Sequence, residues 1–180
     1  MPDSTTTTEI RNFAAQRRYS PATVERWLAL PASDGAALLD LARELRLGEH
    51  QLLALWEWAE EIAARDRQSL AHVLTSEPVG ATRRSHLGRN DRLKRIKSTL
   101  RSLRFPQLTA LETRLDGLVR DLALPSTVRV ALPDGLEGDA LRVEIVADSP
   151  AALRIAAEHL SAAAATAMCA EIFALLHEAP

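Results

Sequence analysis

The sequence is short of cysteine, glycine and aromatic residues. Cys169 is the only cysteine among 180 residues, so no disulfide can form within the chain. Seven glycines, none of them gathered into a glycine-rich motif, argue against a phosphate-binding loop. Aromatic residues make up 4% of the chain, which favours alanine-rich helices packed closely together over a thick β core. A single cysteine also fits a reducing compartment, and we expect a cytoplasmic protein.

Long hydrophobic runs are missing as well. The alanine-rich run at residues 161–170 stops at Glu171, whereas a bilayer-spanning helix needs about 20 apolar residues. Residues 1–8 contain no basic segment followed by an apolar stretch, so we expect no secretory signal. The sequence therefore predicts no membrane span.

Residues suited to catalysis or metal binding are few and scattered. No two histidines have the spacing of a helical zinc site, and we interpret Cys169 as a small buried residue. The acidic residues at 60–61 and 134–139 are interpreted as a solvated helix face and a hairpin loop without the ligand spacing of a calcium loop. We expect no metal, no cofactor and no enzymatic activity. The five histidines are His50, His72, His86, His159 and His177.

Positive charge is concentrated in one segment, although the net charge of the whole chain is only −2. Residues 1–80 contain 8 Lys/Arg and 12 Asp/Glu, and residues 105–180 contain 5 and 11. Residues 81–104 between them contain 9 Lys/Arg and 1 Asp/Glu. A block of one sign on this scale indicates an interaction surface.

The positive segment has the pattern of an amphipathic helix over residues 91–103, with Asn90 as a possible N-cap. A narrow apolar stripe runs through it at spacings of three and four, so it can pack on the protein while cations cover its remaining circumference. If about five cations contact phosphates, the slope of log affinity against log salt is about −4 to −5. The stripe contains Leu93, Ile96, Leu100 and Leu103. The candidate nucleic-acid-binding residues are Arg83, Arg84, Arg89, Arg92, Lys94, Arg95, Lys97, Arg101 and Arg104.

Nucleic acid, with DNA preferred to RNA, is the partner that this density of cations favours. The acidic face of a partner protein, an anionic membrane surface and plain solvation are the alternatives. Solvated helix faces normally mix both signs, and here Asp91 is the single acid.

The N-terminal part is predicted to form a helical bundle. We predict a disordered tail at residues 1–8, a helical domain at 9–75, a linker at 76–90, and a basic helix plus a dimerisation domain at 91–180. Within the helical domain, helices are predicted at about 9–18, from a Ser20 cap and Pro21 to Leu30, from a Ser33 or Asp34 cap onward, and at 49–66. The overall class is mainly α.

Residues 41–52 have the apolar pattern of a helix–turn–helix pair, with arginine at position 46 where the turn usually has glycine. The second helix would present several glutamates between residues 49 and 61, which repel phosphate. Readout of a specific sequence by this helix is therefore not expected. Trp27, Trp56 and Trp58 are predicted to form the core of this bundle. If Trp56 and Trp58 were instead exposed on one face, the chain would fit a protein-docking adaptor or transcriptional regulator.

The C-terminal part changes from helical to alternating periodicity. After a helix at about 107–122, two alternating runs flank the Asp134–Gly135 turn, which predicts an antiparallel hairpin; a long helix follows from Ser149 and Pro150 to Leu175. A two-stranded hairpin is marginal alone. Either the two flanking helices cover it, or two copies pair to form a four-stranded sheet, and we expect the homodimer. The candidate dimer-interface residues are Val128, Val130, Leu141, Val143 and Ile145.

This helix–strand–strand–helix order, over about residues 108–160, resembles the dimerisation domain of ParB-type partition proteins. The matching segments are residues 111–115, 127–130, 141–145 and 148–153, and residues 41–52 distantly resemble the helix–turn–helix region of that family. The resemblance implies a homodimer that contacts DNA non-specifically. It does not extend to CTP binding, because residues 1–20 lack the family's nucleotide-binding domain. The sequence thus predicts a dimeric, largely sequence-tolerant DNA-binding accessory protein of partition or nucleoid type.

Overall fold

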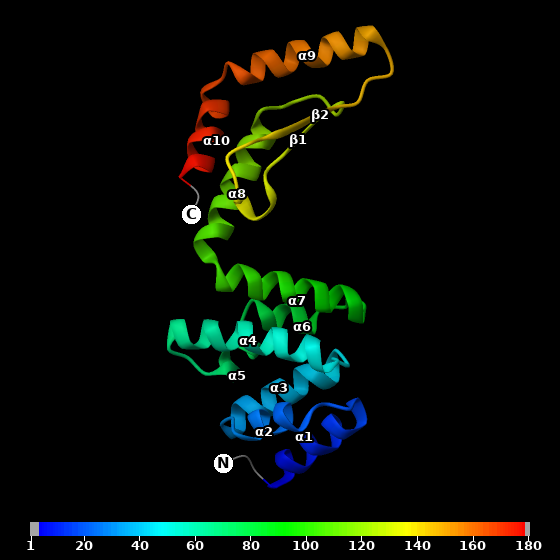
Figure 1. Ribbon diagram of the computed structural model, residues 1–180, viewed down its shortest axis with the longest axis vertical. Helices are drawn as coiled ribbons and strands as arrows, with labels where there is room; N and C mark the ends of the chain where they lie inside the picture. The colour runs from blue at the N-terminus through cyan, green and yellow to red at the C-terminus, as the bar shows by residue number, and fades with distance from the viewer. Residues whose placement is uncertain (1–3, 179–180) are drawn as a thin grey trace. The chain divides into compact units, whose positions relative to one another are not determined.

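The computed structural model describes residues 4–178, and the chain divides into two compact units, residues 1–105 and 106–180. Among the described residues, ten α-helices accompany a single two-stranded antiparallel hairpin, so the predicted mainly α class with a hairpin is confirmed (Figure 1). The helices of unit 1 are α1 (Ser4–Arg17), α2 (Pro21–Leu28), α3 (Ala32–Glu44), α4 (Glu49–Asp66), α5 (Leu70–Thr75), α6 (Val79–Arg84) and α7 (Arg89–Arg104). Unit 2 contains α8 (Pro106–Asp121), β1 (Val128–Ala131), the 3-10 turn η1 (Asp134–Leu136), β2 (Arg142–Ile145), α9 (Pro150–Ala164) and α10 (Ala167–His177).

Unit 1 is built around α4, which packs against α5 and α7, while α3 packs against α1 and α5. Its core is aromatic at the centre. Trp27 is fully buried, with ring centroids 6.4 Å from Phe13, 6.3 Å from Tyr19 and 6.3 Å from Trp56. The Trp27 indole also donates to the carbonyl of Gly35 at 3.1 Å. Trp27 and Trp56 are thus core residues as predicted, whereas Trp58 is only half-buried against this core.

Local sequence signals placed two helices correctly. The Ser20 hydroxyl accepts from the amide of Thr23, and Pro21 is the first residue of α2, as predicted. The α4 helix has the predicted bounds. The predicted cap of α3 is wrong, because α3 begins at Ala32 and Asp34 is buried inside it, where its carboxylate accepts from the amide of Ala71 at 2.8 Å.

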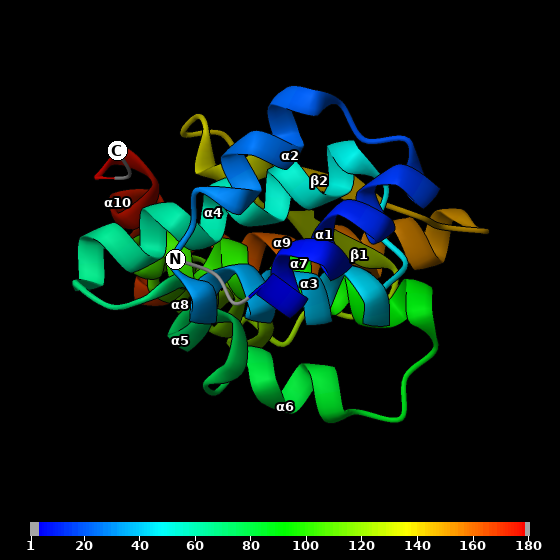
Figure 2. The same ribbon diagram turned by 90° about the horizontal axis from the view of Figure 1, so that it is seen from below.

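The predicted domain boundaries differ from the observed ones. Residues 4–8 belong to α1 and are not a disordered tail; residues 1–3 lie outside the described residues. Residues 76–90 are not a linker, because they contain α6, in which Val79 and Thr82 are buried. The basic helix α7 belongs to unit 1 and not to the C-terminal unit. Figure 2 shows α6 joined to α7 by residues 85–88, which belong to no helix.

Glu49, the first residue of α4, joins this helix to the start of α2. Its carboxylate accepts from the Ser20 amide at 2.9 Å, the Ser20 hydroxyl at 2.7 Å and the Thr23 hydroxyl at 2.6 Å. Hydrogen bonds from the Ser20 and Thr23 side chains and from the Ser20 amide lower the pKa of Glu49 below the ordinary glutamate value of 4.5. The carboxylate is therefore ionised at neutral pH and serves as a structural acceptor.

This depressed pKa makes stability depend on pH. Since the folded-state pKa is lower than the unfolded value, Glu49 stabilises the fold above pH 4.5, and that contribution is lost as the pH falls through the folded-state pKa. Glu49→Gln is expected to lower the free energy of unfolding at neutral pH, with the difference from wild type shrinking in acid. Urea unfolding at neutral pH and at about pH 3 measures this difference. A difference that stays constant or grows in acid would contradict the assignment.

Unit 2 has a smaller core. The side chains of Leu115, Leu136, Ile172 and Leu176 are buried together, and α8 and α10 pack side by side (Figure 1). The two strands pair antiparallel, with Val128 opposite Ile145 and Val130 opposite Val143. These four apolar side chains share one face of the hairpin, because side chains alternate along a strand.

The predicted long C-terminal helix is broken. It ends as α9 at Ala164 and restarts as α10 at Ala167, because the Thr166 hydroxyl caps the new helix by accepting from the amide of Cys169 at 3.2 Å. The bend between the two helices is 69°. No single helix in residues 4–178 is long and apolar enough to cross a membrane, although this bent pair taken together meets the length and composition required.

Candidate nucleic-acid interface

The basic helix α7 is anchored by its apolar stripe. Leu93, Ile96 and Leu100 are buried in the core of unit 1, and α7 packs against both α4 and α6. This orientation was predicted from the spacing of three and four. The cations of α7 therefore occupy its flanks and its outer surface.

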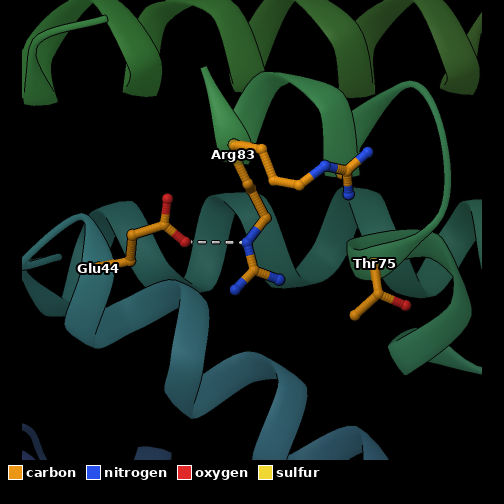
Figure 3. Close-up of a pocket in the computed structure, with 5 residues that line it drawn as sticks. Glu44, Thr75 and Arg83 are labelled. Carbon is orange, nitrogen blue, oxygen red and sulfur yellow. Dashed lines mark hydrogen bonds and ion pairs between the residues drawn. The ribbon is translucent and has the colours of Figure 1, made fainter. Parts of the chain in front are cut away.

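Two of the predicted DNA-binding arginines face an internal carboxylate instead. Glu44, at the end of α3, accepts from Arg83 Nε at 3.0 Å and from an Arg92 terminal nitrogen at 2.8 Å. The two arginine side chains are only 15% and 23% exposed, and Arg83 also donates to the carbonyl of Leu74. Figure 3 shows Arg83 turned toward Glu44 beside Thr75, in a hollow of about 310 Å³. Arg83 and Arg92 therefore form internal ion pairs that help to hold unit 1 together.

Two further arginines pair with other carboxylates of unit 1. Arg84 pairs with Glu77, and Arg104 pairs with Glu61. The Arg104 guanidinium also lies over the Trp58 and Phe105 rings, at 6.0 Å and 4.7 Å from their centroids. Both pairs are partly exposed, so each stabilises the fold only weakly and a phosphate group can compete for the arginine.

Arg89 is used to cap a helix. Its Nε donates to the carbonyl of Leu45 at 2.6 Å and a terminal nitrogen donates to the carbonyl of Arg46 at 3.3 Å, so it satisfies carbonyl groups at the end of α3. Arg83, Arg84, Arg89, Arg92 and Arg104 thus bind acceptors of the chain itself. Ion pairs between residues 39 to 48 positions apart leave no trace in local spacing, which is why the sequence did not reveal them.

The remaining cations lie together on the outer part of α7. Lys94 and Arg95 are exposed, Lys97 is half-buried, and none of the three has an ion pair within residues 4–178. We call Lys94, Arg95 and Lys97 the α7 cations. Arg101 is exposed on the same helix.

Each flank of the α7 cations has a hollow. An open hollow of about 330 Å³ lies beside Arg95 on one flank, and another of about 330 Å³ lies beside Lys94 and Lys97 on the other. The first hollow is lined by three hydroxyl groups, and hydroxyls as well as cations bind phosphate oxygens in protein–DNA complexes. The sequence analysis did not select these hydroxyl groups, although serine and threonine residues follow the cations in the same helix. They belong to Ser98, Thr99 and Ser102.

The outer face of α4 remains acidic, as predicted. Arg26 of α2 pairs with Glu60 at 2.6 Å and approaches Glu57 to 3.9 Å.

Trp56, whose exposure would favour a protein-docking adaptor, is fully buried and donates to Glu60 at 2.6 Å. No group of three or more His, Cys, Asp or Glu side chains suited to a metal ion occurs in the part of the chain that the structure describes.

The predicted dimer-interface residues differ in exposure. Val128 is buried within unit 2, Val130 and Ile145 are half-buried, and Leu141 packs against the core. Val143 is 41% exposed. Other exposed apolar side chains of unit 2, which the sequence analysis did not select, are Val146, Leu153, Ile155 and Phe173.

No protein-family model, curated protein or solved structure matches the chain.

Proposed function

We propose that this protein is a dimeric, largely sequence-tolerant DNA-binding accessory protein of partition or nucleoid type. One observation carries the proposal: three cations within four residues of an anchored helix have no carboxylate partner among the described residues. Fixed cations at this density match the regular spacing of backbone phosphates and release condensed counterions on binding. The contacts are to the backbone, which carries little sequence information.

The charges of the two units support different roles for them. Residues 1–105 contain 17 Lys/Arg and 13 Asp/Glu, whereas residues 106–180 contain 5 and 11. Unit 1 is the one that a polyanion would approach, and unit 2 would repel it. We therefore assign nucleic-acid binding to unit 1 and self-association to unit 2.

Self-association is supported by the exposed apolar side chains of unit 2. Val143 projects from the hairpin, while Val146, Leu153 and Ile155 are 58%, 50% and 51% exposed. A two-stranded hairpin seldom provides enough core alone, and a second copy supplies the missing strands. We propose that the occupant of this surface is a second copy of unit 2.

The salt dependence of binding tests the role of the α7 cations. Replacing Lys94, Arg95 and Lys97 with alanine should reduce the slope of log affinity against log salt by roughly 2.7, because about 0.9 is lost for each phosphate contact. Fluorescence anisotropy with a random-sequence duplex at four salt concentrations gives this slope. Circular dichroism establishes that the variant is folded.

A triple variant in unit 2 controls for net charge. Arg120, Arg129 and Arg142 are exposed, so replacing them with alanine removes the same charge from the other unit. This control should keep the wild-type slope. An equal loss in both variants would mean that net charge alone drives binding, and an unchanged slope in the α7 variant would refute the proposal.

A further inference from the structure

Three helices of unit 1 are followed by an arginine in the left-handed conformation. Arg18 follows α1 with φ +56°, Arg46 follows α3 with φ +47°, and Arg67 follows α4 with φ +54°. This conformation suits glycine, and to a lesser extent asparagine, at helix C-termini, and it is disfavoured for a side chain with a Cβ atom. All three arginines are exposed and have no ion pair within residues 4–178.

Hydrogen bonds hold the segments that follow Arg18 and Arg46 against each other. The Tyr19 hydroxyl donates to the carbonyl of Leu47 at 2.9 Å, and burial raises the pKa of Tyr19 to about 12, so the donor stays protonated. One residue further along, Ser20 donates to Glu49. The two arginines therefore stand at the same edge of unit 1.

The start of α7 completes this edge. Arg89 donates to the carbonyls of Leu45 and Arg46, which brings a third cationic segment to the turn between α3 and α4. In Figures 1 and 2 the α1–α2 junction, this turn and the start of α7 all lie along the right-hand side of unit 1. Arg67 is at the opposite end of α4, about 27 Å away for an 18-residue helix.

Positive charge exceeds negative charge at this edge. Residues 17–20, 43–50 and 88–92 contain six arginines and three acidic residues. Among these, Arg92 is paired with Glu44 and Arg43 is paired with Glu9, whereas Glu49 accepts from neutral groups and keeps its negative charge. Arg18 and Arg46 have no ion pair within residues 4–178. A polyanion at this edge would meet the exposed guanidinium groups first.

We propose that Arg18 and Arg46 form a second phosphate-binding surface for the nucleic-acid backbone, separate from the α7 cations. This inference rests on the proposed function. Guanidinium groups bind phosphate oxygens in a bidentate manner, and backbone contacts of this kind tolerate any base sequence.

The left-handed conformation allows charge and stability to be separated in one experiment. In Arg18→Gly/Arg46→Gly both charges are lost, while the new residue suits the backbone conformation. The slope of log affinity against log salt should fall by roughly 1.8, so that between about 50 and 200 mM salt the variant loses roughly tenfold less affinity than wild type. The melting temperature should be unchanged or higher.

Arg67→Gly is the matched control, because it makes the same change in the same conformation at the far end of α4. It should keep the wild-type slope for binding to a short random duplex. A melting temperature lowered by Arg18→Gly/Arg46→Gly would mean that these cations serve the helix C-termini, as cations near a helix dipole do, and would overturn the inference.

The remaining outcomes separate this inference from the proposed function. If Arg18→Gly/Arg46→Gly keeps the wild-type slope while the α7 variant loses it, only the second surface is refuted. If the glycine variant loses slope and the α7 variant does not, the second surface stands and the role of the α7 cations is refuted. A wild-type protein that does not bind duplex DNA would overturn both.

Discussion

Val143→Glu is expected to convert the protein from a dimer to a monomer. Val143 is 41% exposed on the apolar face of the hairpin, which we propose is covered by a second copy. A symmetric interface would bury two carboxylates at this position, and burying an unpaired charge costs several kcal/mol. We expect the dimer dissociation constant to rise by on the order of 100-fold or more. Light scattering coupled to size exclusion should give about twice the 19.7 kDa chain mass for wild type and the chain mass for the variant.

Ala131→Glu is the control for this substitution. Ala131 is exposed on the opposite face of the hairpin, where a glutamate would face Arg142 on the paired strand. This variant should remain dimeric. A wild-type protein that is monomeric at micromolar concentration, or a Val143→Glu variant that stays dimeric, would contradict the proposed interface.

Trp27→Ala should reduce the free energy of unfolding of unit 1 by about 3–5 kcal/mol. The side chain is fully buried between three other aromatic rings, and its indole donates to a buried carbonyl of α3. Its removal creates a cavity and deletes the side-chain hydrogen bond to that carbonyl. Since domains are typically stable by about 5–15 kcal/mol, this loss is a large share of the total. Urea unfolding followed by circular dichroism measures the loss.

Trp58→Ala provides the comparison, because Trp58 is half-buried at the edge of the same core. Its ring contacts the Arg104 guanidinium and is not enclosed by aromatic neighbours. The loss of stability should be well below that of Trp27→Ala. Equal losses in the two variants would show that the aromatic cluster is not the centre of the core.

Local signals in the sequence predicted several elements correctly because the interactions that form them are local. The Ser20 cap and Pro21 begin α2, and the apolar spacing of α4 fixes its extent. The alternation around residues 128–145 gives the hairpin and its shared apolar face. The break at Thr166 was also encoded locally, by a hydroxyl that accepts from the amide of Cys169, but the alanine-rich surroundings hid it.

Features that depend on distant residues were not predictable in this way. The boundary between the units lies at residues 105–106 because α7 packs against α4. Residues 76–90 were predicted to be a linker, but they belong to unit 1 because Val79 and Thr82 are buried there. The sequence selected nine cations, but it could not distinguish those that pair with carboxylates of the chain from those that do not. Only the geometry shows that Arg83 and Arg92 share one carboxylate while Lys94 and Arg95 remain exposed.

The double ion pair of Glu44 links the stability of unit 1 to the charge that unit 1 exposes. One carboxylate holds guanidinium groups from positions 39 and 48 residues away, so its loss would set two charges free in a single mutational step. Such a change would remove the ion pairs that join α3 to α6 and to α7, and at the same time it would add cations to the outer surface. A substitution at position 44 is therefore expected to change the stability of unit 1 and the positive charge of its surface together.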